Sequence, residues 1–235
     1  MDLQGRSETM ARVETTIPFC IDWLPDRRLL VVSGQERLLL RRENDGRLVT
    51  HADLSGLCEG SFNEIVVDGR GNIYVNGGDI VALVRRDESV RKVADGVAFP
   101  NGMAVTADNS TLILAESHGK RLTAFDIGED GSLSRRRAWA ELGSGTPDGI
   151  CIDTDGAVWY ADVPNKQCVR VREGGEVLET VALDRGGFAC ALGGAERKTL
   201  FIMAAQWYGF PRMAESFGTG QVLTLEVSTP AAGWP

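Results

Sequence analysis

Two asparagines and one aspartate stand at the same position of a repeated pattern in this chain. Asn63, Asn101 and Asp148 each lie two residues before a short apolar run, and Phe19 and Phe188 occupy that position in two further repeats. The five residues follow one another at intervals of 44, 38, 47 and 40. If the repeats are equivalent parts of one fold, the polar side chains converge. Amide and carboxylate oxygens gathered in this way suit a divalent cation such as Ca²⁺, Mg²⁺, Mn²⁺ or Zn²⁺.

The same three residues have a second interpretation, in which they only shape turns. Asn-Gly and Asp-Gly pairs are common where a chain turns into a strand, and glycine follows both Asn101 and Asp148. The register shared by the three residues favours a site over an accident of turn chemistry. Both interpretations stay open at the level of the sequence.

The elements that must position these residues are short strands. Residues 65–75 show the pattern: an apolar run, a turn rich in Asp, Gly and Asn, and a second apolar run, which together predict a β-hairpin. The chain contains 28 glycines and 8 prolines, and its windows with helical periodicity are short and interrupted. We therefore expect an all-β protein.

This hairpin recurs five times, and a second hairpin follows most copies. The copies cover residues 21–32, 65–75, 103–115, 150–161 and 190–204. A unit of about 40 residues with four strands is typical of a β-propeller blade. The sequence thus predicts one β-propeller domain over residues 1–235, with five four-stranded blades. A β-sandwich is the alternative, but it gives no reason for the 40-residue period.

The two ends of the chain each offer one unpaired strand. Residues 221–227 read as a third strand without a fourth, and residues 7–14 read as a single outer strand. We expect the N-terminal strand to complete the last blade and close the ring, which would remove exposed strand edges. An open ring, or one completed by another chain, is the competing arrangement.

Other candidate site residues follow from strand direction in such a blade. If the innermost strand begins at the mouth of the channel, the second strand ends there, which places Glu116, His118 and Trp207 on the same face as Asn63. Residues 206–218 are rich in aromatics and too long for a tight turn. We expect them to form a lid, and we expect Asn63, Glu116, His118 and Trp207 to bind substrate. Each could also be an ordinary surface-loop residue.

The sequence supports neither a nucleophilic catalytic triad nor a metal site built from cysteine thiolates. The chain has no Gly-x-Ser-x-Gly motif beside either histidine. Its five cysteines are widely spread and form no CxxC pair, which predicts reduced thiols and a cytoplasmic location. Cys151 is expected to be a packing residue.

Charge and hydropathy limit the possible partners. Twenty-five Lys and Arg against 33 Asp and Glu give a net charge of −8, which disfavours nucleic acid as a ligand. We expect no membrane-spanning segment and no secretory signal, because no long apolar stretch occurs. A small-molecule substrate is the expected partner, and a homo-oligomer is possible.

Several motifs resemble the regucalcin and gluconolactonase family, also called the senescence-marker-protein family. The segments that carry the resemblance are FNE at 62–64, FPNGMAV at 99–105, TADNSTL at 106–112, PDGICID at 147–153 and GAVWYAD at 156–162. The resemblance runs from about residue 17 to the C-terminus. It implies a propeller, in the family six-bladed, with a divalent metal at the channel mouth and hydrolysis of small cyclic esters.

The resemblance also implies roles for individual residues. The PNG asparagine, Asn101, and the PDG aspartate, Asp148, would bind the metal, and Asn63 would face the substrate. The family's opening segment, with a metal-binding glutamate, has no counterpart here. The third ligand would then be Glu64 or Glu116.

The function predicted from these observations is metal-assisted lactone hydrolysis. Asp148 is the expected catalytic residue, Asn101, Asp148 and Glu64 are the expected ligands, and Ca²⁺ or Zn²⁺ is expected ahead of Mg²⁺ or Mn²⁺. The alternative is a catalytically altered propeller that binds a small molecule or a protein partner.

Overall fold

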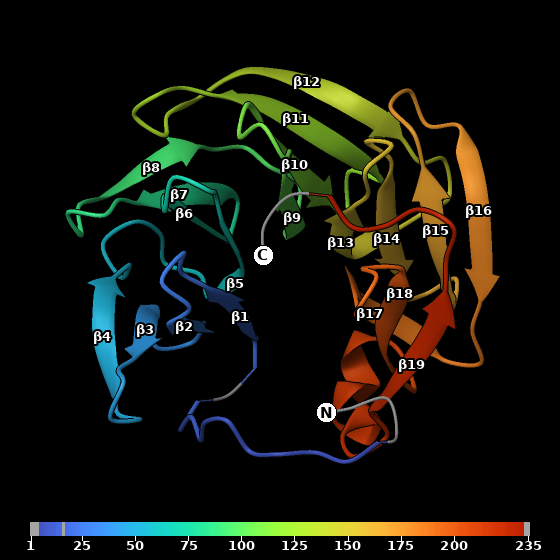
Figure 1. Cartoon of the computed structure of the whole chain (residues 1–235), viewed down its shortest axis with the longest axis horizontal. Helices are drawn as coiled ribbons and strands as arrows, with labels where there is room; N and C mark the ends of the chain where they lie inside the picture. Colours follow the sequence, from blue (N-terminus) through green and yellow to red (C-terminus); the bar gives the residue numbers. More distant parts are fainter. Residues whose placement is uncertain (1–4, 16, 233–235) are drawn as a thin grey trace.

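The computed structural model describes residues 5–15 and 17–232, and within them the chain is almost entirely β. The strands form five antiparallel sheets in chain order, and each sheet is one blade around a central channel (Figure 1). This arrangement confirms the expected all-β propeller and its five blades.

Each blade begins with its innermost strand and ends at the rim. The first blade comprises β1 (Phe19–Trp23), β2 (Leu29–Ser33), β3 (Leu38–Arg42) and β4 (Leu48–Asp53). The second comprises β5 (Phe62–Val67), β6 (Ile73–Gly77), β7 (Ile80–Val84) and β8 (Val90–Ala94). The third comprises β9 (Pro100–Val105), β10 (Thr111–Glu116), β11 (Arg121–Ile127) and β12 (Leu133–Glu141). The fourth comprises β13 (Pro147–Ile152), β14 (Val158–Asp162), β15 (Gln167–Val171) and β16 (Val177–Ala182). The fifth comprises β17 (Gly186–Gly193), β18 (Thr199–Ala205) and β19 (Gln221–Glu226), with the short 3₁₀ helix η1 (Phe210–Ser216) between the last two.

Apolar side chains fill the spaces between successive blades, because neither face of a single blade can be covered by that blade alone. Four buried clusters lie between the four successive pairs of blades from first to fifth. Tyr74 from β6 and Leu112 from β10, both fully buried, join the second and third blades, while Trp159 and Leu200 join the fourth and fifth. The inner strands β1, β5, β9, β13 and β17 also pack in that order. This packing fixes the inner strands that carry the site.

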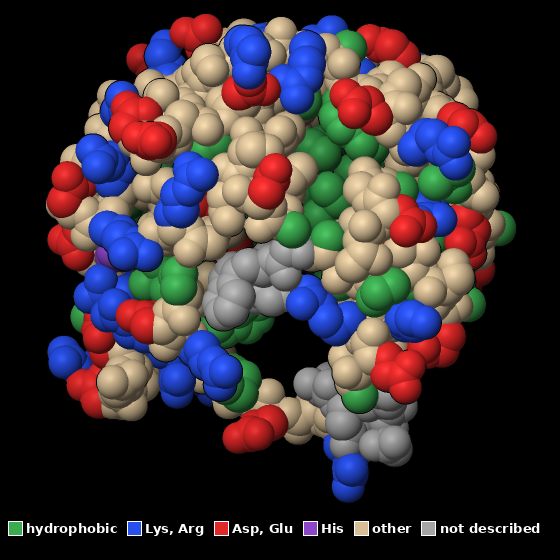
Figure 2. Space-filling model, turned by 45° about the horizontal axis from the view of Figure 1, so that its top comes forward, with side chains coloured by type: hydrophobic (Ala, Val, Ile, Leu, Met, Phe, Trp, Pro, Cys, Tyr) green, Lys and Arg blue, Asp and Glu red, His purple; other side chains and the backbone are tan. Residues whose placement is uncertain are grey.

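The ring is interrupted between the first and fifth blades, and the expected closure by residues 7–14 is wrong. β19 pairs with β18, and residues 5–15 contain no strand. They cross the interruption as an extended segment, and the space-filling view shows an opening beside them (Figures 1 and 2). The fifth blade therefore has three strands among the residues described.

Contacts with the first blade hold the end of this segment, and little apolar packing holds the rest. Met10 is 65% exposed. At its end, Thr15 is tied to the first blade by hydrogen bonds with Ser33 and Glu36, both at 2.8 Å.

The first blade also differs from the others at the interruption. One face of β1 carries Phe19, Ile21 and Trp23, which are 56%, 45% and 40% exposed. In the second, third and fourth blades, the inner strand packs between the inner strands of both neighbouring blades. Phe19 is not structurally equivalent to Asn63, Asn101 and Asp148, as the repeat predicted. The strand of Phe19, β1, pairs with β2 without any break in register.

In the described part of the chain, no helix has the length and apolar character needed to cross a membrane.

Candidate functional site

The three predicted polar residues stand at the same irregularity in three neighbouring blades. In β5, Phe62 pairs with Gly77 and Ile65 with Val75, so two residues, Asn63 and Glu64, oppose one on β6. The same two-against-one bulge follows Pro100 in β9 and Pro147 in β13. Bulges re-aim side chains and are frequent beside active sites. Asn63, Asn101 and Asp148 are each the first residue of their bulge.

Glycine at the second bulge position lets β9 and β13 approach closely. A Cβ on Gly102 would lie 2.5 Å from Ile150 N and 2.6 Å from Asp148 O, distances that real Cβ atoms do not show. Gly149 in β13 is similarly confined, because its Cβ would lie 2.7 Å from Ala189 Cα on β17. The PNG and PDG motifs therefore have a structural explanation: their glycines bring Asn101 beside Asp148.

Hydrogen bonds fix the Asn101 side chain. Asn63 Nδ2 donates to Asn101 Oδ1 at 3.0 Å, and Asn101 Nδ2 donates to Ser117 Oγ at 3.3 Å. Ser117 Oγ in turn donates to Pro147 O at 2.6 Å, next to Asp148. This chain of bonds runs across three blades, and it sets which end of the Asn101 amide is the oxygen.

Two further polar residues support this chain. Asn76 Nδ2 donates to Asn101 O at 2.6 Å from the end of β6, and Ser117 follows the end of β10. Strand direction predicts that the second strands end at the mouth, but Ser117 was not among the predicted site residues. In the sequence, Ser117 is only a small polar residue directly after an apolar strand. That pattern is too common to identify a site residue by itself.

Asp148 lies in an environment that disfavours its charge. Desolvation raises the pKa of this carboxyl well above its usual range, and the nearby Glu64 carboxylate raises it further. A hydrogen bond with the Asn101 side chain acts in the opposite direction. Asp148 and Asn101 are therefore in contact, and Glu64 is close enough to repel Asp148.

Glu64 is the second carboxylate of the site. Desolvation raises its pKa to about 7, although a hydrogen bond from Cys20 Sγ, 3.0 Å from Glu64 Oε2, lowers it. No described salt bridge joins Glu64 or Asp148 to a Lys or Arg side chain. Two carboxylates that repel each other without a basic partner form a site where a cation would be stabilised.

The ligand atoms that this site offers are of the type that a hard divalent cation prefers. The site offers carboxylate oxygens from Asp148 and Glu64 and the amide oxygen of Asn101, the oxygen ligands that Ca²⁺ accepts. In the residues described, no three His, Cys, Asp or Glu side chains come together as a metal centre. Any such site must therefore use the Asn101 amide.

Glu116 does not belong to this group, which corrects its expected role in substrate binding. Its side chain is fully buried, and it accepts hydrogen bonds from Arg121 and Arg136 at 3.1 Å and from Ala98 N at 2.7 Å. Burial alone would raise its pKa, but bonds from Arg121 and Thr123 outweigh burial and lower the pKa to about 2. Glu116 is a structural carboxylate that joins strands of the third blade, and it is equally unsuited as a metal ligand.

His118 and Trp207 do lie on the face that carries Asn101. His118 follows Ser117, its ring stacks on Phe99 at 4.4 Å, and its backbone N donates to Ala98 O at 3.2 Å. Trp207 Cβ lies beside Gly186 at the start of β17. Cys151, expected to pack, contacts Cys190 Sγ at 3.9 Å between β13 and β17.

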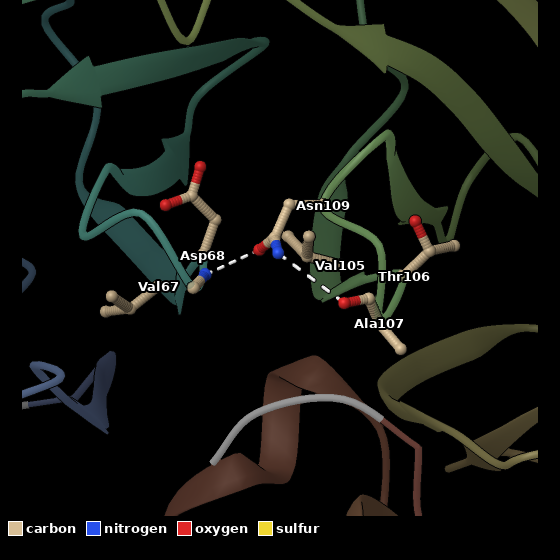
Figure 3. Close-up of a pocket in the computed structure, with 7 residues that line it drawn as sticks. Val67, Asp68, Val105, Thr106, Ala107 and Asn109 are labelled. Atoms are coloured by element: carbon tan, nitrogen blue, oxygen red, sulfur yellow. Dashed lines mark hydrogen bonds between the residues drawn. The ribbon is translucent and has the colours of Figure 1, made fainter. Parts of the chain in front are cut away.

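A separate pocket lies at the other end of the inner strands. It is lined where β5 and β9 end, at Val67 and Val105, and there Asn109 Oδ1 accepts a hydrogen bond from Gly69 N at 2.6 Å (Figure 3). Its carboxylate, Asp68, is occupied by Asn72 N and Asn72 Nδ2, both at 2.8 Å. The polar side chains that line this pocket hydrogen-bond within or between turns. None of its described lining residues offers an unpaired carboxylate to a ligand.

The chain is similar in sequence to several known proteins. Residues 1–206 match the family described as "SMP-30/Gluconolactonase/LRE-like region". The chain is 33% identical to regucalcin of Danio rerio over 124 residues, which are 51% of this chain and 42% of the relative. It is 26% identical to 6-deoxy-6-sulfogluconolactonase of Pseudomonas putida over 198 residues, 77% of this chain and 67% of the relative. The matches thus span from under half to about two thirds of these relatives' own length.

Solved structures give the same result. A luciferin-regenerating enzyme superposes with a TM-score of 0.80 at 19% identity, covering 95% of this chain and 82% of its own, which supports the fold. A gluconolactonase of Xanthomonas campestris superposes with a TM-score of 0.66 at 25% identity, covering 78% of this chain and 68% of its own.

Proposed function

Because the chain belongs to the SMP-30/gluconolactonase/LRE-like family, we propose that it hydrolyses small cyclic esters at the channel mouth. The observation that carries this proposal is the meeting of Asn63, Asn101 and Asp148 at equivalent bulges, joined by the 3.0 Å bond between the two amides. Relatives named sulfogluconolactonase and pentonolactonase support lactones as the substrate class.

A divalent cation fits this proposal, and Asp148, Asn101 and Glu64 are the residues that would hold it. Ca²⁺ suits these oxygen donors, as do Mg²⁺ and Mn²⁺, and Zn²⁺ also accepts carboxylate oxygens. Bound there, the ion would polarise the ester carbonyl and stabilise negative charge on its oxygen.

The protein's own groups would do the rest. Asn63 has a second N–H on Nδ2, beyond the one bonded to Asn101, with which to orient a substrate oxygen. Asp148 would accept the proton of the attacking water on a carboxylate oxygen. The water oxygen bonds to the carbonyl carbon, the ring C–O bond breaks, and the proton passes to the leaving ring oxygen.

A second candidate function is a propeller that binds a small molecule without turning it over. It is favoured by the lack, among the described residues, of three acidic, His or Cys side chains grouped as a metal centre. Such a protein would bind a lactone or its open acid with no release of product.

A proton-release assay with a panel of γ- and δ-lactones distinguishes the hydrolase from the binding protein, because opening a lactone yields an acid that releases a proton. We expect turnover by the purified protein to require added divalent cation, to stop with EDTA, and to fall at least 100-fold in Asp148→Ala. Asp45→Ala, a change in an exposed hairpin of the first blade, is the matched control and should leave turnover unchanged. Binding without turnover under every cation tried would instead support the binding protein.

A further inference from the structure

Five aromatic rings form a continuous row on the mouth side of the propeller. His118 stacks on Phe99 with ring centres 4.4 Å apart, and Phe99 meets the edge of Phe210 at 6.2 Å. Phe210 meets Trp207 at 5.2 Å, and Trp207 meets Phe188 at 5.8 Å. We call these five residues the aromatic arc.

The arc runs beside the candidate site from the third blade to the fifth. Phe99 directly precedes Pro100 and Asn101 at the start of β9, and Phe188 lies in β17, the strand that packs against β13. Asp148 begins the bulge of β13, between these two strands. The arc therefore spans the fourth blade, whose inner strand carries Asp148.

The arc is exposed at Phe99, His118 and Phe210 and half-buried at Phe188 and Trp207, and it does not belong to any of the buried clusters. Phe99 is 40% and Phe210 63% exposed. Neighbouring exposed apolar side chains that approach one another in this way are typical of binding surfaces. Its rings are available to a ligand.

Phe99 is also held in an unusual backbone conformation. Its φ is 57°, in the left-handed region that a bulky residue rarely adopts. Ser117 N donates to Phe99 O at 3.1 Å and stabilises this geometry. In this conformation the Phe99 ring lies against His118 and Phe210.

Apart from His118 at its end, the arc consists of apolar phenyl and indole rings. Nearby Arg212 is occupied, since it lies over Tyr208 at 4.9 Å and donates to Glu215 Oε1 at 2.7 Å. A lactone ring held at Asn63 and Asp148 would therefore have rings along one side, in place of the several hydrogen-bonding groups that a polyhydroxylated ring needs.

We propose that the aromatic arc binds an apolar substituent of the substrate, so that this protein prefers lactones carrying an aryl or alkyl group over free sugar lactones. This proposal rests on the proposed function for its reaction, but the binding step is independent of catalysis. Phe99 and Phe210 are the residues that determine this specificity.

Substrate competition tests the proposal. We expect kcat/KM for 4-phenyl-γ-butyrolactone to exceed that for D-glucono-δ-lactone, and this ratio to fall about tenfold in Phe210→Ala, mainly through KM. Phe217→Ala is the matched control, because Phe217 is 62% exposed in the same segment but lies outside the arc. An unchanged ratio in Phe210→Ala, or preference for the sugar lactone, would overturn the proposal.

A binding measurement separates this proposal from the reaction itself. The non-hydrolysable cyclic ether 2-phenyltetrahydrofuran should change the tryptophan fluorescence of the wild-type protein and bind about tenfold more weakly to Phe210→Ala but not to Phe217→Ala. If this binding occurs but no lactone is turned over, the proposed hydrolysis is wrong, while the proposed binding role of the aromatic arc is supported. If the ether does not bind, or binds all three proteins equally, the arc has no such role.

Discussion

The side-chain amide of Asn63 donates to Asn101 Oδ1 across 3.0 Å, from the inner strand of one blade to the inner strand of the next. The two residues are 38 positions apart in the sequence, and each is the first residue of a bulge in its strand. The bond leaves Asn101 Oδ1 with a second lone pair and Asn63 with a second N–H. One side chain can thus serve as a ligand while the other contacts substrate.

This division of roles predicts different effects for the two amides. Asn63→Ala removes a substrate contact but no ligand that the cation depends on, so KM for a turned-over lactone should rise about tenfold with cation affinity little changed. Steady-state kinetics at saturating cation, together with a cation titration, provides the measurement. A large loss of cation affinity in Asn63→Ala would show that Asn63 is itself a ligand.

Gly102 should be intolerant of any side chain. In Gly102→Ala, the new Cβ would meet backbone atoms of β13 at 2.5 and 2.6 Å, so β9 and β13 must separate. We expect the free energy of unfolding to fall by about 2–3 kcal/mol, as for other overpacked positions. Urea unfolding measures this change. Gly56→Ala, where a Cβ meets nothing within 4 Å, is the control, and equal stability of the two variants would contradict the close approach.

Glu116 should stabilise the fold in a pH-dependent way. Its folded-state pKa of about 2 lies below the ordinary value of 4.5, so its stabilisation is complete above about pH 4.5 and is lost as the pH falls toward 2. Glu116→Gln leaves Arg121 and Arg136 without an anionic partner and should lower the free energy of unfolding by about 3 kcal/mol at pH 7.

The pH dependence distinguishes this ion pair from simple packing. The difference in unfolding free energy between wild type and Glu116→Gln should shrink between pH 4.5 and pH 2.5, whereas the exposed substitution Glu173→Gln should have little effect at either pH. A difference that stays constant over this range would mean that the charge of Glu116 does not carry the stabilisation.

The sequence predicted the blades and the meeting of the three polar residues because both follow from a repeat and its register. The details that failed depend on contacts between distant segments. Residues 7–14 matched the missing strand in length, but they form no strand, and Thr15 at their end is hydrogen-bonded to Ser33 and Glu36 of the first blade. Glu116 was placed correctly at the mouth end of β10, yet Arg136 from the outer strand β12 reaches it there, which no local pattern signals.

The aromatic arc was only partly foreseeable for the same reason. His118, Trp207 and the aromatic segment 206–218 stood out in the sequence. The link between them is Phe99, whose positive φ turns its ring toward both His118 and Phe210. Nothing in the sequence around Phe99 indicates that conformation, because left-handed bulky residues are uncommon.

The most direct test of the site is a calorimetric titration of the metal-free protein with Ca²⁺, Zn²⁺, Mn²⁺ and Mg²⁺. We predict one binding site per chain for at least one of these ions. Its affinity should fall about 100-fold in Asp148→Ala, which loses a carboxylate, and about tenfold in Asn101→Ala, which loses a neutral ligand, while Asp45→Ala binds as the wild type does. Absence of binding to the wild type, or binding that Asp148→Ala leaves intact, would contradict a cation site at these bulges.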